Sequence, residues 1–190
     1  MKRSVFCFTT GLLVMLSGFV HAAQDPTASS QPAMLKPFCL AAKQKGDFAL
    51  TVARVRTLLV ESRFRVIGEY SPFANAHVFA VTDETLIKTA ANTPYGALGA
   101  VFRVGIARVG EEIQVMYNNP TYIGVAYRMG STLDQFKTKL TRTLGHVRDY
   151  GGEGIAADEL PEYNYAFGLE SFGDFYEFAQ YKTHEEAVQK

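Results

Sequence analysis

The chain has 190 residues, of which 47% are hydrophobic and 20% are charged, and its 19 basic side chains balance its 19 acidic ones. This balance argues against a protein that nucleic acid or anionic lipid attracts through net charge. A chain of this length can bury a core of its own. We therefore expect one globular domain that binds neither nucleic acid nor a membrane surface.

Residues 1–22 follow the order of a secretory signal. Lys2 and Arg3 precede an apolar run over residues 5–20, and Ala22 offers a small residue for cleavage. A retained membrane anchor is the alternative, but the run is shorter than the ~20 apolar residues that span a bilayer. We expect cleavage near Ala22 and a periplasmic mature chain without a membrane span.

The segment after the signal, residues 23–45, is predicted to be a flexible tether and lead-in, because residues 23–33 are small and polar with two prolines. A single α+β domain is expected over residues 46–190. Cys39 is the one cysteine of the mature chain, so no intramolecular disulfide can form. We expect a buried Cys39 that packs as a small hydrophobe, with an intermolecular disulfide or a reactive thiol as alternatives.

The first elements are predicted from residue 47 onward. Asp47 caps a helix over residues 48–62, whose apolar face is spaced as one helical stripe. Strands are expected over residues 64–70 and 76–82, on either side of a turn-forming stretch. Asp83 then caps a short helix that ends near Ala91.

A hairpin follows, with strands over residues 99–109 and 112–117 and a two-residue link that begins with Gly110. Pro120 ends the second strand, so a loop is expected over residues 117–122. Ser131 caps a second long helix over residues 132–144, which Gly145 ends and whose buried stripe comprises Leu133, Phe136, Leu140 and Leu144.

Alternating aromatic residues predict strands over residues 163–167 and 175–181, and Thr183 opens a final helix. The fold class is α+β, a mostly antiparallel sheet packed against two main amphipathic helices. Two similar helix–strand–strand units, one from each long helix, are an open alternative.

Several stretches resemble exported bacterial members of the domain-of-unknown-function family 302. They are residues 68–73 (GEYSPF) leading into 76–82, residues 103–104 with 114–122, residues 126–129, and residues 163–165 with 172–174. The resemblance covers roughly residues 46–190. It implies a compact α+β domain that often self-associates, and it supplies no substrate, cofactor or catalytic residue.

The usual motifs of cofactor and metal sites are missing from the sequence. The glycine-rich residues 151–154 lack the Lys-Ser/Thr that follows in a phosphate loop, so a flexible loop is expected there. His77, His146 and His184 are scattered without ligand spacing, which predicts no metal and no cofactor.

Catalytic motifs are missing as well. No Gly-x-Ser-x-Gly elbow surrounds a serine, so structural roles are expected for Ser71 and Cys39. The carboxylates of Asp158, Glu159 and Glu162 predict a solvated loop. No catalytic residue is therefore proposed from the sequence.

Aromatic side chains concentrate between residues 163 and 181. They either fill the core or line an apolar pocket or dimer patch. The candidate ligand or interface residues combine this segment with the loop at 117–122, and they are Tyr117, Asn118, Asn119, Tyr122, Tyr163, Tyr165, Phe172, Asp174, Phe175 and Tyr176.

These observations favour a non-catalytic binding or protein-interaction module that contacts an apolar small molecule or a protein partner, with a homo-oligomer as one form. One alternative is a small periplasmic enzyme that uses His77, Asp174 or the tyrosines as acid–base groups. Another alternative is a structural partner in an envelope assembly.

Overall fold

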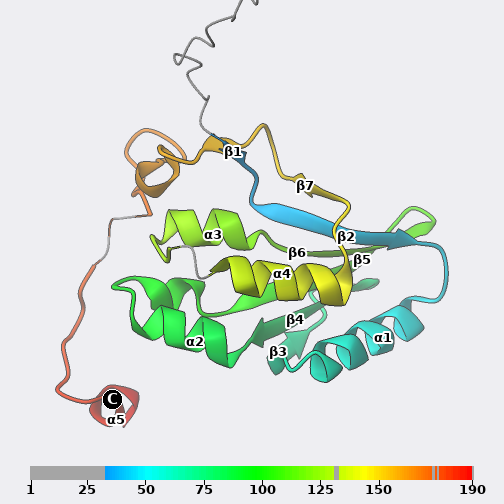
Figure 1. Cartoon of the computed structure of the whole chain (residues 1–190), viewed down its shortest axis with the longest axis horizontal. Coiled ribbons are helices and arrows are strands. Elements are labelled where there is room, and N and C mark those ends of the chain that lie inside the picture. Colours follow the sequence, from blue (N-terminus) through cyan, green and yellow to red (C-terminus); the bar gives the residue numbers. More distant parts are fainter. Residues whose placement is uncertain (1–32, 131–132, 173, 175, 190) are drawn as a thin grey trace, which may run out of the picture. The chain divides into compact units, whose positions relative to one another are not determined.

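The structure of the chain is a computed structural model that describes residues 33–130, 133–172, 174 and 176–189. The predicted signal over residues 1–22 and the polar part of the predicted tether lie outside the described residues. A six-stranded antiparallel sheet has the order β3-β4-β5-β6-β2-β7 (Figure 1). Its strands are β2 (Phe38–Gln44), β3 (Arg65–Tyr70), β4 (Ala76–Thr82), β5 (Phe102–Val109), β6 (Glu112–Asn118) and β7 (Arg148–Tyr150).

Four helices lie near this sheet, and Figure 1 shows α1, α2 and α4 on the same side of it. The helices are α1 (Phe48–Glu61), α2 (Glu84–Ala91), α3 (Pro120–Ala126), α4 (Leu133–Leu144) and, near the C-terminus, α5 (His184–Gln189). Short 3-10 helices cover Gly96–Gly99 and Leu160–Glu162, and β1 (Met34–Leu35) pairs with β8 (Ile155–Ala156). The described residues contain no helix long and apolar enough to cross a membrane.

The sheet buries one face against the helices. Along β6, Ile113, Val115 and Tyr117 are buried and alternate with half-buried residues. This period of two is expected when an antiparallel sheet packs one face on a core and leaves the other partly solvated. Gly110 has a φ of 61° at the first turn position, as predicted for the hairpin of β5 and β6.

The two long helices follow the sequence prediction closely. The Asp47 carboxylate accepts a hydrogen bond from the backbone N–H of Leu50 at 2.8 Å and caps α1. The Phe136 ring of α4 lies 4.7 Å from that of Phe102 and 5.6 Å from that of Phe64. The predicted stripe of α4 is buried at all four positions, whereas the Ser131 cap lies outside the described residues.

The segment before α1 differs from the prediction. Residues 23–45 were expected to lead into the domain without belonging to it, whereas β2 is an interior strand of the sheet between β6 and β7. Cys39, Leu40 and Ala41 are buried in it. The sequence of β2 is a short apolar run without clear alternation, and such a run does not predict a strand by itself. The strands that pair with it, β6 and β7, lie at residues 112–118 and 148–150.

Three further expectations are corrected. Pro120 ends β6 but also begins α3, with Asn119 as the N-cap, so no open loop follows the strand. No strand forms among the described residues of 163–167 and 175–181, where only an isolated bridge between Asn164 and Ser171 occurs. The second helix–strand–strand unit is therefore wrong, because α4 leads into β7, whose partner is β2. The α+β class with a mostly antiparallel sheet is confirmed.

Candidate functional site

The position of β2 between two strands gathers polar groups around one buried thiol. Cys39 lies opposite Tyr117 of β6 on one side and opposite Asp149 of β7 on the other. Directly opposed residues of antiparallel strands point to the same face of the sheet. The strand register therefore brings the thiol, the phenol and the carboxylate together.

The end of α4 adds a histidine to this group. Gly145 has a φ of 93°, and a Cβ atom at this position would lie 2.8 Å from the Ala41 carbonyl oxygen, so a side chain would collide there. Two residues further on, the backbone N–H of Val147 donates to the Leu40 carbonyl at 2.7 Å. These contacts hold His146 against β2, between the helix and β7.

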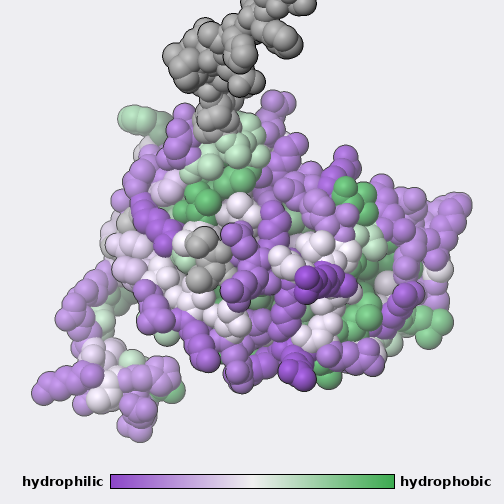
Figure 2. All heavy atoms as spheres, in the orientation of Figure 1, coloured by the Kyte–Doolittle hydropathy of each residue, from purple (hydrophilic) through white to green (hydrophobic). Residues whose placement is uncertain are grey.

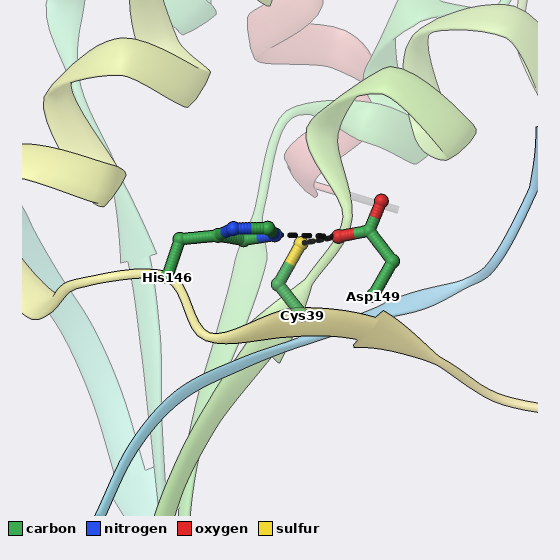
Figure 3. A group of neighbouring side chains, drawn as sticks. All are labelled: Cys39, His146 and Asp149. Atoms are coloured by element: carbon green, nitrogen blue, oxygen red, sulfur yellow. Dashed lines mark hydrogen bonds and ion pairs between the residues drawn. The ribbon is translucent and has the colours of Figure 1, made fainter.

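Cys39, His146 and Asp149 form one cluster, which we call the thiol cluster (Figure 3). The Cys39 thiol donates to Asp149 Oδ1 at 3.2 Å, and His146 Nε2 lies 2.7 Å from the same oxygen. One ligand atom of each residue, sulfur, nitrogen and oxygen, lies within 4.8 Å of the other two. Figure 3 shows the three side chains pointing toward a common centre.

A second layer of hydrogen bonds fixes the cluster. The buried Asn119 amide donates to Asp149 Oδ2 at 3.2 Å and to the Lys36 carbonyl at 2.9 Å, while its own oxygen accepts from the Thr121 N–H. The Tyr117 hydroxyl donates to the Gly145 carbonyl at 3.2 Å. The carboxylate is therefore oriented before any ligand arrives.

Burial decides the protonation of the cluster. Desolvation and, to a smaller extent, the hydrogen bond to Asp149 together raise the pKa of Cys39 to about 12. Desolvation also acts to raise the pKa of Asp149, but the hydrogen bonds from His146 and Cys39 outweigh it and lower that pKa overall. Near neutral pH the cluster holds a thiol beside a carboxylate, which disfavours Cys39 as a free nucleophile.

The same atoms suit a metal ion. Zn²⁺ takes sulfur, imidazole nitrogen and carboxylate oxygen in a tetrahedron, with ligand atoms about 3.3 to 3.5 Å apart for the usual bond lengths. The observed sulfur–oxygen and nitrogen–oxygen separations of 3.2 and 2.7 Å need to open by no more than about 0.6 Å for such an arrangement, and the sulfur and nitrogen, which lie within 4.8 Å of each other, need to come to about 3.5 Å. Cys39 is fully buried, whereas the side chains of His146 and Asp149 are each about a third exposed, so the cluster opens to solvent on their side.

A second histidine lies in a different setting on the β3–β4 hairpin. Ser71 Oγ is 3.0 Å from His77 Nδ1, and His77 Nε2 is 3.3 Å from Glu69 Oε2. Arg56 of α1 forms an ion pair with the same carboxylate. We call these residues the hairpin cluster; its carboxylate already has a cation.

The structure distributes the predicted residues of 117–122 over three places. Tyr117 and Asn119 are buried and support the thiol cluster, whereas Asn118 accepts a hydrogen bond from the Arg103 N–H at the end of β6. Tyr122 is buried on α3, where the Phe172 ring lies 6.4 Å away. A ligand-binding role for these four residues stays a prediction.

The C-terminal candidates lie mostly at the surface. Tyr165 and Tyr176 expose 84% and 72% of their area, and Tyr163 is also exposed. Asp174 accepts hydrogen bonds from the Ser171 N–H and hydroxyl and so closes a turn. Among the described residues no contact joins Asp174 to His77, the residue that the enzyme alternative would combine with it. Phe175 lies outside the described residues.

Sequence reasoning missed His146 and Asp149 as site residues. The absence of a metal was predicted because the histidines are scattered along the chain, but the fold places His146 beside Cys39, 107 positions earlier in the numbering. The one local signal is a histidine and an aspartate three residues apart, directly after the helix-ending Gly145.

Comparisons with known proteins give a fold and no activity. No family model matches the chain, and no curated protein matches it significantly. Among solved structures it is similar to an uncharacterised conserved protein, DUF302, from Bacillus stearothermophilus, with a TM-score of 0.51 and 11% identity over 59% of this chain and 97% of that one. The chain therefore has a DUF302-like fold, as the sequence resemblance implied.

Proposed function

We propose that this chain is an exported, non-catalytic domain that binds one thiophilic divalent cation, such as Zn²⁺, at the thiol cluster. The observation that carries the proposal is the convergence of Cys39 Sγ, His146 Nε2 and an Asp149 oxygen within 4.8 Å of one another. Three protein ligands can hold this ion with a water in the solvent-facing fourth position, an arrangement that zinc enzymes also use.

The charge of the cluster supports a cation. The hydrogen-bond partners of Asp149 are Cys39, His146 and Asn119, and among the described residues no lysine or arginine forms an ion pair with it. Lys137 influences Asp149 only from a distance, since its amino group donates to Thr121. Once Cys39 loses its proton, thiolate and carboxylate together supply two negative charges for a doubly charged ion.

The location of the domain is part of the proposal. The signal pattern of residues 1–22 supports export from a bacterial cytoplasm, and the near-neutral charge of the remaining chain supports a role apart from membranes and nucleic acid. A cation-binding domain in the periplasm would then hold, buffer or hand over the ion without chemical conversion.

The test is a titration of the chain from residue 23 with Zn²⁺ and with Co²⁺. We expect one ion per chain in native mass spectrometry, and with Co²⁺ a sulfur-to-metal charge-transfer absorption that reports the Cys39 thiolate. The His77→Ala variant is the matched control, because it removes a histidine that also contacts a carboxylate, and it should bind as the wild type does. A Co²⁺ spectrum without the thiolate band, or loss of binding only in His77→Ala, would refute the site.

A further inference from the structure

One edge of the main sheet is open. β3 is the terminal strand and pairs only with β4, so its outer backbone N–H and C=O groups have no strand partner in the described residues. Proteins usually shorten, bury or otherwise protect such an edge, because it is a template for another strand. The opposite edge strand, β7, has only three residues.

The surface around this edge is apolar and basic, and we call it the β3 surface. Figure 2 shows hydrophobic atoms at the surface over α1, where Leu50 is 72% exposed and Val60 is 58% exposed. Ile67, Tyr70 and Phe73 expose more than half of their area on β3 and the turn that follows.

The charges of the β3 surface are unbalanced. From Phe48 to Tyr70 the chain carries four arginines and two glutamates, a net charge of +2. Arg54, Arg63 and Arg65 form no ion pair with any other described residue. A hollow of about 330 Å³ opens beside the strand, lined by Arg63, Arg65, Asp83, Glu84, Thr85 and Lys139.

The C-terminal segment has the complementary properties. Residues 176–189, which we call the C-terminal segment, carry three glutamates and one lysine, a net charge of −2. Phe178 exposes 96% of its area, and Tyr181 is also exposed. Residues 176–182 form no helix or strand. These seven residues are long enough to pair with all six residues of β3.

The root of this segment is fixed to the domain. The Phe172 ring lies 5.5 Å from the Tyr127 ring and 6.4 Å from the Tyr122 ring, both in an edge-to-face arrangement. The segment therefore follows a residue that is packed on the domain, while its own aromatic side chains Phe178 and Tyr181 are exposed.

We propose that the C-terminal segment of one copy docks on the β3 surface of a second copy, where residues 176–182 extend the sheet along the free edge of β3. Backbone hydrogen bonds supply the register, the exposed aromatics cover the apolar side chains, and the glutamates face the unpaired arginines. If each copy gives its segment to the other, the exchange closes as a two-fold dimer in which both edges are covered.

The experiment is charge-reversal complementation, followed by sedimentation velocity of the chain from residue 23 at low and high concentration. One variant reverses the surface (Arg54→Glu with Arg65→Glu), and the other reverses the segment (Glu177→Lys with Glu185→Lys). All four side chains are exposed, so the fold should persist. The wild type should dimerise, and each variant alone should be at least tenfold weaker.

Mixing the two variants distinguishes the proposal from a general charge effect. The positive segment of one variant fits the negative surface of the other, so an equimolar mixture should form a heterodimer again. The control Lys88→Glu with Arg103→Glu changes the same charge elsewhere and should dimerise as the wild type does. A monomeric wild type at every concentration, equal dimerisation of all variants, or a mixture that stays monomeric would overturn the proposal.

Discussion

The thiol cluster and the hairpin cluster use similar residues for opposite purposes. Each joins a histidine, a carboxylate and a small nucleophilic side chain within hydrogen-bond distance. In the hairpin cluster Arg56 neutralises Glu69, and Ser71 is exposed. In the thiol cluster the partners of Asp149 are Cys39, His146 and Asn119, none of them a lysine or arginine, and the sulfur is fully buried.

The difference teaches that the residue types alone do not define a cation site. A metal must replace protons or another cation, so a carboxylate that already has an arginine offers little gain. The hairpin cluster is mainly a local consequence of cross-strand neighbours on β3 and β4, whereas the thiol cluster needs two parts of the chain that lie about 110 positions apart. The following predictions test this contrast.

The largest effect is expected from Cys39→Ser. Because the serine hydroxyl is a poor Zn²⁺ ligand and keeps its proton, the affinity for Zn²⁺ should fall by about 100-fold or more. Loss of a direct ligand should cost at least as much as loss of a residue that only supports a ligand. Competition with a coloured chelator measures the affinity, and circular dichroism checks the fold. The counterpart Ser71→Ala should leave the affinity unchanged; an equal loss in both variants would remove the contrast between the clusters.

A strong pH dependence of binding comes next. The pKa of Cys39 is raised to about 12, so Zn²⁺ must displace the thiol proton throughout the neutral range. The apparent affinity should therefore rise by about tenfold per pH unit between about pH 7 and 8. Calorimetry in two buffers of different ionisation enthalpy should detect the released proton, and an affinity that does not change with pH would contradict a thiolate ligand.

The support of Asp149 gives a smaller effect. Asn119→Ser keeps an oxygen that can cap α3 but removes the amide donor to Asp149, so the Zn²⁺ affinity should fall by about tenfold. Asn118→Ser is the matched control, because Asn118 bonds the Arg103 N–H and not the cluster. Parallel chelator competition on the two variants should separate them, and identical affinities would show that the carboxylate needs no such support.

The smallest effect is expected at the hairpin cluster. Arg56→Met removes a partly exposed ion pair and a contact with the Phe79 ring, which together stabilise the fold by about 0.5 to 1.5 kcal/mol. Urea denaturation measures this loss. Zn²⁺ binding at the thiol cluster should not change, and a large drop in affinity would mean that the two clusters are coupled.

Most local elements could be predicted from the sequence, since their signals lie within a few residues. Asp47 and Asp83 accept the cap hydrogen bonds expected of them, and Gly110 turns the predicted hairpin. The sequence prediction lacks helix α3 because Pro120 indicates the end of a strand, although proline is also favoured at the first position of a helix.

The candidate site could not be predicted, because it depends on pairing between distant segments. Nothing near Cys39 indicates that Asp149 will lie opposite it, and the choice of β7 as the partner of β2 follows from the whole sheet. The C-terminal aromatics show the converse: their alternation is typical of a strand, but a strand needs a partner, and the described part of the chain supplies none.

The placement of β2 also affects how accessible the Cys39 thiol is before the domain has folded. The hydrogen bond between Cys39 and Asp149 joins residues 110 positions apart, so it can form only after almost the whole domain is present. Contacts of such long sequence separation form late, since their loop entropy must be overcome first. A chain in which β7 has not yet paired with β2 lacks this hydrogen bond and the cover that β7 gives, so its thiol is more accessible to oxidants and to other thiols.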